Sequence, residues 1–296
     1  MDTFLAILVF LLELTVSLVC LTVLLSFTMA WYERTNSDPD VITRRFTSRG
    51  IFLSFWLMLQ ETGSLLATLL LRPLGWGNPK TTFLAESDQP PVILLHGLFQ
   101  NRACLYWLQV RLKSAGFKNV VAINTPPWRD LETLTEILAR KIDEVRIAYK
   151  VEKVCLVGHS MGGIIARNYV QLRGGAPRVS CCVTLGAPHS GSKLAPFALS
   201  QLGKSLLPGT PFLQQLNAAP KPAEGRLVAI YTRHDNIVLP ATNARLDTAD
   251  ENIELDGMGH TTLLFHPRAI QTIIAQLTGA LHADTQADDT PDLRVD

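Results

Sequence analysis

A glycine-bounded serine between a predicted strand and a predicted helix constrains this chain more than any other feature. The apolar, β-branched run 154–157 leads into the pentapeptide Gly-His-Ser-Met-Gly at 158–162, and a helical apolar pattern continues over 164–170. In this context a Gly-x-Ser-x-Gly sequence holds its serine on a sharp turn, because the glycines let strand and helix approach closely. A serine hydroxyl becomes a nucleophile only when geometry and a base activate it. Ser160 is therefore the candidate nucleophile, and a plain structural turn is the alternative.

An upstream segment provides a candidate oxyanion loop. Residues 91–95 have the pattern of a buried strand, and His96 and Gly97 follow it. An acyl-transfer site needs two backbone N–H donors directed at one point. We expect these donors at Met161, directly after the serine, and at Leu98, in the loop after the first main strand. A tight strand-to-helix turn shaped by His96 is the simpler interpretation.

Two downstream loops supply a candidate acid and base. Asp235 follows the predicted strand 226–231, and His260 follows the short strand 252–255 within a Gly-Met-Gly-His sequence. A base must accept the serine proton, and a carboxylate must orient that base. We expect both just past strand ends, where open α/β sheets place their sites. His266 is a less favoured base, since Pro267 follows it at a helix start. The competing acids near His260 are Asp247, Asp250, Glu251, Glu254 and Asp256.

From about residue 90 to about residue 281, the chain resembles α/β-hydrolases of the bacterial lipase and esterase type. The resemblance is carried by His96-Gly97, the pentapeptide 158–162, the segment 185–191, Asp235 and the loop 257–260. The Gly-Ala-Pro-His-Ser-Gly sequence within 185–191 is also similar to that of lipid deacylases. The order Ser160, Asp235, His260 is the order found in this superfamily. The resemblance implies a serine hydrolase that cleaves carboxylic esters.

The chain alternates predicted strands and helices, which indicates an α/β fold with a mostly parallel sheet flanked by helices. The expected strands are 91–95, 119–124, 153–157, 179–185, 226–231 and 252–255, and the expected helices are 102–115, 130–149, 161–173 and 267–281. The two leading strands of the larger α/β-hydrolase family are missing, which predicts a compact version of the fold.

An apolar insertion at about 191–223 interrupts this alternation and predicts a helical cap over the site. Such a cap binds acyl chains and excludes water, although ordinary packing on the sheet explains the same pattern. The predicted substrate-binding residues are Leu194 and Phe197 in the cap, with Phe99 and His189 beside it. His189 has a structural alternative at the hinge of the cap.

Two apolar stretches precede the predicted hydrolase. Residues 4–31 are long enough to cross a bilayer, which takes about 20 apolar residues. Residues 51–71 are interrupted by polar residues that follow one helical face, including Glu61. This second stretch is a spanning helix with a polar seam, an interfacial helix, or a helix packed on the hydrolase. In a hairpin, Glu13 and Glu61 are candidates to face each other.

Arginines between the two stretches bear on topology. Arg34, Arg44, Arg45 and Arg49 favour a cytoplasmic location for residues 32–50 of a bacterial inner-membrane protein. If both stretches span, the hydrolase faces the periplasm; if only the first spans, it stays in the cytoplasm.

Composition limits the remaining possibilities. The net charge is +1, so no nucleic-acid partner is predicted, and 47% hydrophobic residues fit a membrane-attached enzyme whose partners are an acyl ester or lipid and the bilayer. No His, Cys, Asp or Glu cluster has metal spacing, and no cofactor is predicted. The predicted parts are a membrane anchor (1–72), a linker (73–89), a hydrolase domain (90–282) and a disordered tail (283–296). The five cysteines are read as free thiols.

Two other functions remain open at this stage. A site that excludes water passes an acyl group to an alcohol as readily as to water, so the same triad suits an acyltransferase. A non-catalytic membrane scaffold with a hydrolase fold is the alternative from another class. The sequence does not fix the oligomeric state.

Overall fold

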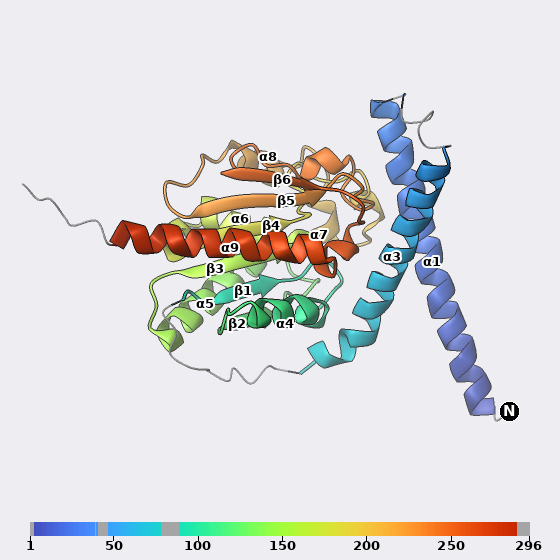
Figure 1. The fold of residues 1–296 in the computed structure, drawn as a ribbon, viewed down its shortest axis with the longest axis horizontal. Coiled ribbons are helices and arrows are strands. Elements are labelled where there is room, and N and C mark those ends of the chain that lie inside the picture. The colour runs from blue at the N-terminus through green and yellow to red at the C-terminus, as the bar shows by residue number, and fades with distance from the viewer. Residues whose placement is uncertain (1–2, 39, 41–46, 78–88, 289–296) are drawn as a thin grey trace, which may run out of the picture.

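The predicted hydrolase domain (residues 90–282) is built around one fully parallel sheet. A computed structural model describes residues 3–38, 40, 47–77 and 89–288. Its six strands lie in the order β2-β1-β3-β4-β5-β6 (Figure 1). The strands are β1 (Val92–Leu95), β2 (Val120–Ile123), β3 (Val154–His159), β4 (Val179–Leu185), β5 (Arg226–Thr232) and β6 (Glu251–Leu255). The central strands are buried along their whole length, as expected for apolar, β-branched runs in a parallel sheet.

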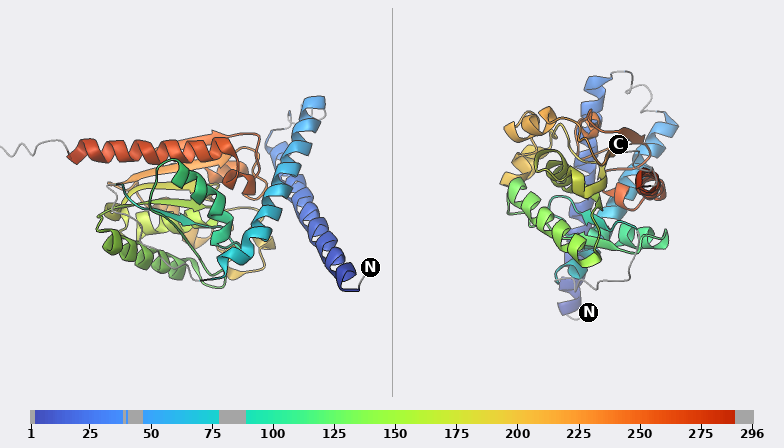
Figure 2. Two further views of the ribbon diagram at one scale, coloured as in Figure 1. Left: turned by 60° about the horizontal axis from the view of Figure 1, so that its bottom comes forward. Right: turned by 90° about the vertical axis from the view of Figure 1, so that its left-hand side faces the viewer.

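Helices cover both faces of this sheet. On one face, α5 (Leu131–Tyr149) and α6 (Met161–Leu172) bury their apolar stripes against the strands. On the other, α4 (Tyr106–Ser114) and α9 (Pro267–Asp288) do the same (Figure 2, right). The predicted α/β architecture is therefore confirmed, with each predicted strand and helix present. The helix α9 continues to residue 288, past the position of about 283 at which the tail was predicted to begin. Residues 289–296 lie outside the described residues.

The insertion after β4 forms short helices. They are η4 (Ala195–Phe197), α7 (Gln201–Lys204) and α8 (Pro211–Ala218). Leu202, Leu206, Leu213 and Leu216 are buried, and Leu202, Leu206 and Leu216 join the core on the α6 side of the sheet. Leu199, in contrast, is 95% exposed. One face of the insertion therefore packs on the core, and a role as a cap over the site stays a prediction.

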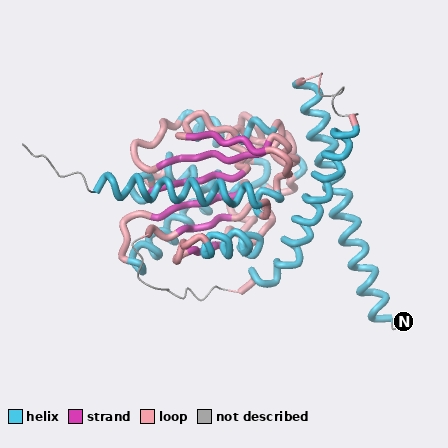
Figure 3. The backbone as a smooth tube through the Cα atoms, viewed as in Figure 1, coloured by secondary structure: helices cyan, strands magenta, loops and turns pink. Residues whose placement is uncertain are grey.

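Two long apolar helices precede the sheet. The first, α1 (Thr3–Ser37), runs beside α3 (Ser48–Leu71), and the two lie across one end of the hydrolase (Figures 1 and 3). Val19, Val23 and Phe27 of α1 pack against Leu57 of α3. Both helices are long and apolar enough to cross a membrane. A turn of 3-10 helix, η1 (Arg72–Gly75), continues α3 within the predicted linker, and residues 78–88 lie outside the described residues.

The polar face of α3 meets the hydrolase. Buried residues of α3 recur at helical spacing, namely Leu57, Glu61, Ser64 and Thr68. Glu61 and Ser64 bond to residues after β6, and η1 bonds to the loop after β1. Of the three readings of residues 51–71, packing on the hydrolase thus describes the inner face of α3. Its opposite face is apolar and exposed, so a role at a membrane remains a prediction.

No disulfide joins any of the five cysteines, all of which lie in the described ranges; Cys20 is exposed, and the other four are buried. Cys155 and Cys181 point to the α9 side of the sheet, and Cys182 points to the α6 side. This split follows from alternation along β4, where adjacent side chains face opposite layers.

Candidate active site

Ser160 occupies a strained turn between β3 and α6. Its φ of 54° and ψ of −125° lie outside the regions that L-residues favour, a conformation that costs about 1–3 kcal/mol. The turn is held because the Ser160 N–H donates to the Leu185 carbonyl at 2.8 Å. The flanking glycines are required by space: a Cβ on Gly158 would lie 2.4 Å from the Gly162 carbonyl oxygen. The strand-turn-helix geometry expected around Ser160 is therefore present.

The loop after β1 lies directly beside this serine. A Cβ on Gly97 would lie 3.0 Å from the Ser160 Cβ, so only a glycine leaves room there. His96 bonds through Nδ1 to the Gly97 carbonyl at 2.8 Å, and its Nε2 accepts the Thr125 N–H at 3.0 Å. Burial, with a smaller contribution from the charge of Arg72, lowers the pKa of His96 to about 4, so the ring is neutral and Nδ1 carries its proton. His96 therefore fixes the Gly97 carbonyl as an acceptor.

Fixing that carbonyl also fixes the next N–H. In a trans peptide, the C=O and N–H groups point in opposite directions. The Leu98 N–H is thus directed away from His96. Phe99, which follows, has a φ of 59°, an uncommon value for a residue with a side chain. The second donor expected from sequence, Met161, is the first residue of α6, where backbone N–H groups have no acceptor within the helix.

Asp235 and His260 form a buried pair. Asp235 Oδ2 lies 2.8 Å from His260 Nδ1, and both residues are almost fully buried. The other carboxylate oxygen accepts the N–H groups of Ile237 and Val238 at 2.8 and 2.7 Å. Burial by itself lowers the pKa of His260, but the charge of Asp235, its hydrogen bond and the charge of Glu61 outweigh burial and raise this pKa above its ordinary value.

The competing acids all have partners elsewhere. Asp256 pairs with Arg268, Glu254 with Arg233 and Glu251 with Arg226. Asp250 accepts the Leu227 N–H and pairs with Lys221, and Asp247 pairs with Arg245. Asp235 is the acid that bonds to His260 among these candidates. His266 lies at the start of α9 and bonds to the Arg268 N–H.

The end of β4 joins the serine side of the site to the histidine side. Leu185 accepts the Ser160 N–H, and the next residue, Gly186, packs on His260: a Cβ there would lie 3.3 Å from His260 Nδ1. His159 adds a second link, because its Nε2 lies 3.2 Å from the His260 carbonyl oxygen and the two rings stand 4.8 Å apart. Ser160, Asp235 and His260 thus follow the carboxyl ends of β3, β5 and β6, and the end of β4 lies between them.

The four predicted substrate-binding residues have different surroundings. Phe99 and Phe197 are exposed, and Leu194 is half-buried. His189 is fully buried: its Nε2 lies 2.9 Å from Thr184 Oγ1 and its Nδ1 lies 3.5 Å from Arg167 Nη1. Burial and the charge of Arg167 lower its pKa well below the ordinary value. This environment matches the structural alternative for His189.

Arg167 is a buried cation for which no role was predicted from the sequence. Its guanidinium donates to Asn217 Oδ1 and to the Leu216 carbonyl of α8, at 2.8 and 2.9 Å. Asn217 in turn donates to the His189 carbonyl at 3.0 Å. In the sequence, the sign of this role is an arginine within the apolar helical pattern of residues 164–170. These bonds tie the cap to α6 and β4.

Polar residues of α1 and α3 reach the loop that carries His260, and these contacts were not predicted from the sequence. Glu61, which is fully buried, accepts the N–H groups of Thr261 and Thr262, and Asn236 links His260 to Ser26 of α1. The predicted facing of Glu13 and Glu61 was wrong, because Glu61 bonds to this loop and Glu13 is exposed on α1.

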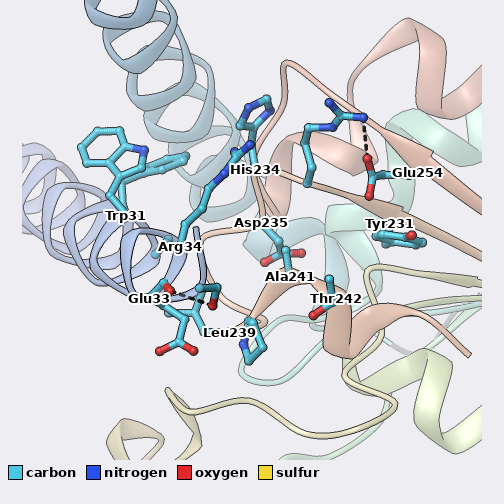
Figure 4. A pocket seen from close by; sticks show the side chains of 15 residues that line it. Trp31, Glu33, Arg34, Tyr231, His234, Asp235, Leu239, Ala241, Thr242 and Glu254 are labelled. Carbon is cyan, nitrogen blue, oxygen red and sulfur yellow. Dashed lines mark hydrogen bonds and ion pairs between the residues drawn. The ribbon is translucent and has the colours of Figure 1, made fainter. Parts of the chain in front are cut away.

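A pocket of about 380 Å³ opens between α1 and the ends of β5 and β6. Figure 4 shows Trp31 and Arg34 of α1 on one wall, with Arg34 extending toward His234. Burial, with the charges of Arg34 and Arg233, lowers the pKa of His234 to about 4. Asp235 lines this pocket but Ser160 does not. The pocket therefore reaches the back of the acid-base pair and not the nucleophile. No group of three or more His, Cys, Asp or Glu side chains with metal-binding geometry occurs in the described ranges.

Comparisons with known proteins agree with this geometry. A family model described as alpha/beta hydrolase fold matches residues 90–207. A triacylglycerol lipase of Pseudarthrobacter phenanthrenivorans is 32% identical over 184 residues, which cover 57% of this chain and 55% of that protein. A triacylglycerol lipase of Burkholderia plantarii is also 32% identical, over 57% of this chain and 49% of its own length. The chain spans about half the length of the curated relatives it matches.

Solved structures show the same fold. Bacillus licheniformis lipase BlEst2 in its mature form superposes with a TM-score of 0.56 at 21% identity, covering 68% of this chain and 96% of that one. Aspergillus fumigatus lipase B superposes with a TM-score of 0.57 at 17% identity, covering 68% of this chain and 55% of that one. At these identities the likeness concerns the fold alone.

Proposed function

We propose that the chain is an α/β-hydrolase that cleaves carboxylic esters through an acyl-enzyme on Ser160. The observation that carries the proposal is the buried Asp235–His260 pair, at 2.8 Å, beside a serine held in a strained turn. A strained conformation persists only where the surrounding structure enforces it, and such strain is concentrated at functional sites. The triacylglycerol lipases that the chain resembles support an ester substrate.

The proposed reaction uses these groups in the roles expected from the sequence. Ser160 Oγ attacks the ester carbonyl while His260 Nε2 takes its proton, and Asp235 keeps the other ring nitrogen protonated. The N–H groups of Leu98 and Met161 stabilise the oxyanion that forms on the carbonyl oxygen. His260 then gives the proton to the leaving alcohol. Water, activated by the same histidine, attacks the acyl-enzyme and releases the acid and Ser160.

The protonation state of His260 sets the pH dependence. His260 must be neutral to accept the serine proton, and the charges of Asp235 and Glu61, which outweigh its burial, raise its pKa. We therefore expect kcat/KM to fall on the acid side with an apparent pKa above the ordinary histidine value of about 6.5. A pH profile of ester hydrolysis checks this, and an acid limb below that value would contradict it.

Lipid or other acyl esters are the proposed substrate class. Phe197 and Leu199 of the cap expose apolar side chains, which suit an acyl chain better than a polar substrate. The outer faces of α1 and α3 are also apolar and exposed, notably at Phe10, Phe52 and Phe55. Lipid is the solvent in which such surfaces are stable.

We propose that α1 embeds in the bilayer and that α3 lies between α1 and the hydrolase. Apolar side chains are exposed all around the first half of α1, whereas α3 bonds to the hydrolase from Gln60 to Ser64. A helix that packs on a protein domain along this length is not surrounded by lipid. This arrangement brings the carboxyl edge of the sheet, and with it Ser160, close to the membrane surface.

Turnover of graded esters tests the function. Membranes containing the full chain are assayed with p-nitrophenyl esters of short and long acyl chains and with emulsified triacylglycerol. We expect hydrolysis that favours long chains and a loss of about 10⁶-fold in kcat for Ser160→Ala. Hydrolysis that survives in Ser160→Ala would contradict the proposal. Acyl transfer to an added alcohol without release of acid would favour the acyltransferase alternative.

A further inference from the structure

The loop that carries His260 is held by bonds to other elements. The Gly257 N–H donates to His234 Nδ1 at 3.0 Å, and the Thr232 hydroxyl donates to the Met258 carbonyl at 2.8 Å. Gly257 has a φ of 73°, and a Cβ on Gly259 would lie 2.4 Å from Glu61 Oε2. Glycine has no side chain and a large conformational freedom, so this segment depends on outside contacts to keep one conformation. A side chain at position 259 would also displace Glu61. The loop is thus shaped to receive a group from another element.

Glu61 is that group. It is fully buried, and its Oε1 accepts the Thr261 N–H at 2.7 Å. Its Oε2 accepts the Thr262 N–H at 3.0 Å and the Thr262 hydroxyl at 2.8 Å. These N–H groups open the 3-10 turn η6 (Thr261–Leu264), directly after His260, where backbone N–H groups lack acceptors. A carboxylate that accepts three hydrogen bonds at such a position is a strong anchor.

A second bridge reaches the same loop from α1. Asn236 Oδ1 accepts the His260 N–H at 3.0 Å, and Asn236 Nδ2 donates to Ser26 Oγ at 2.8 Å. Gln60 of α3 donates to the Gly257 carbonyl at 3.2 Å. The helix α3 therefore bonds to the backbone on both sides of His260, and α1 reaches the His260 N–H through Asn236, although neither helix belongs to the sheet that carries Ser160.

We propose that Glu61 is a positioning residue for His260, through which the α1–α3 pair completes the active site. The inference rests on the proposed function, in which His260 is the base. Glu61 does not touch the reacting atoms; it holds the backbone from which the His260 ring projects. The membrane-facing helix pair is then a working part of the enzyme, and not only an anchor.

Two consequences follow from the contacts. A base displaced by about 1 Å from its productive position loses about 10²-fold in rate, so loosening the loop lowers kcat more than it raises KM. The negative charge of Glu61 also acts with that of Asp235 to raise the pKa of His260, while burial opposes this. Removing the Glu61 charge therefore lowers the pKa of His260. Burial and the neighbouring His260 hold the pKa of His159 well below its usual range.

Glu61→Gln separates positioning from simple packing, because the amide has the same shape but lacks the charge and one acceptor oxygen. We expect kcat per active site to fall about 10- to 100-fold, with KM within about twofold. The acid limb of kcat/KM is expected to move to lower pH, which a merely structural role does not produce. Glu13→Gln is the matched control, since Glu13 is an exposed acid on α1.

Active sites are counted by saturating fluorophosphonate labelling, so that misfolded protein does not enter kcat. Thr262→Val is the second variant: it keeps the β-branched shape and removes the hydroxyl that donates to Glu61. We expect it to lower kcat per labelled site about 3- to 10-fold, consistent with the loss of one hydrogen bond to a charged group. If Glu61→Gln does not fold, the kcat of Thr262→Val per labelled site tests the role of Glu61 instead, and an unchanged kcat would contradict it.

The outcomes separate this inference from the proposed function. A labelled wild type with wild-type kcat and an unmoved acid limb in Glu61→Gln would overturn the role of Glu61 alone. A wild type that neither labels nor turns over esters would remove the function, and the role of Glu61 with it.

Discussion

Leu57 and Leu59 stand two residues apart on α3 and have opposite surroundings. Leu57 is 1% exposed against α1, whereas Leu59 is 51% exposed on the outer face. The same division runs along the helix: its buried face carries Glu61, Ser64 and Thr68, and its exposed face carries Phe52 and Phe55. The polar face of α3 is therefore buried in the protein, and its aromatic face is exposed on the surface.

The helix α5 shows the reverse arrangement within the same molecule. Leu134, Leu138 and Ile142 of α5 are fully buried, and its charged residues face outward, as expected for a helix in water. Both helices cover the hydrolase, so the difference lies in what meets their outer faces. The polar groups of α3 bond to the domain beside it, and under the proposed membrane attachment its exposed apolar groups face lipid.

Among the replacements that compare the two sides of His260, that of Asp235 is expected to have the largest effect. Asp235→Asn removes the acceptor that holds the His260 tautomer, and we expect a loss of about 10⁴-fold in kcat. This loss exceeds the one predicted for Glu61→Gln, so we expect Asp235 to contribute more to kcat than Glu61 does. Asp256→Asn is the control, because Asp256 is an exposed acid paired with Arg268. Equal losses for Asp235→Asn and Asp256→Asn would show that the wrong acid has been assigned.

A charge on the outer face of α3 tests its proposed contact with lipid. Phe52→Asp is expected to weaken membrane association by about 2.5–3.5 kcal/mol, the cost of an acidic side chain in the hydrocarbon region. Extraction of membranes at alkaline pH, followed by blotting of both fractions, measures the change. Ile147→Asp, on the exposed outer face of α5, serves as the control. Equal retention of the two variants in the membrane fraction would contradict the proposed contact between the outer face of α3 and lipid.

Truncation of the two leucines sharpens the comparison further. Leu57→Ala leaves a cavity between α1 and α3 and is expected to cost about 2 kcal/mol or more, whereas Leu59→Ala is expected to be nearly neutral. Thermal inactivation of ester hydrolysis in membranes measures both variants. Similar midpoints for the two would indicate that α1 and α3 do not pack as described.

The smallest effect is expected at the ion pair between α1 and the cap. Lys193 Nζ lies 2.5 Å from Glu33 Oε1 near the surface, and such pairs contribute less than about 1 kcal/mol. Lys193→Ala is therefore expected to leave thermal inactivation almost unchanged, and any difference is expected to vanish at high salt. A large, salt-independent loss would mean that this contact holds the cap in place.

Local patterns account for most of what could be predicted from the sequence. The strand before Ser160 and the helix after it are adjacent in the chain, and the glycines at 158 and 162 are demanded by their close approach. Asp235 and His260 were found because parallel strands end at one edge of the sheet. The family match supports the same fold.

The contacts made by Glu61 could not be predicted in this way. Its partners are backbone N–H groups some 200 residues further along the chain, and backbone groups leave no mark in a sequence. The helical spacing of the polar residues of α3 indicated a polar face but not what would cover it. For His189 the chemistry of the side chain was ambiguous, and its burial beside Arg167 was decided by the packing of the cap.

Labelling by a fluorophosphonate, with the modified residue identified by mass spectrometry, is the most direct test of the central claim. The full chain in membranes is compared with Ser160→Ala and His260→Ala. We expect one phosphonylated site, Ser160, in the wild type and none in either variant, since His260 activates the serine. A folded wild type that does not react, even with detergent present to open the cap, or a label on another residue, would contradict the account.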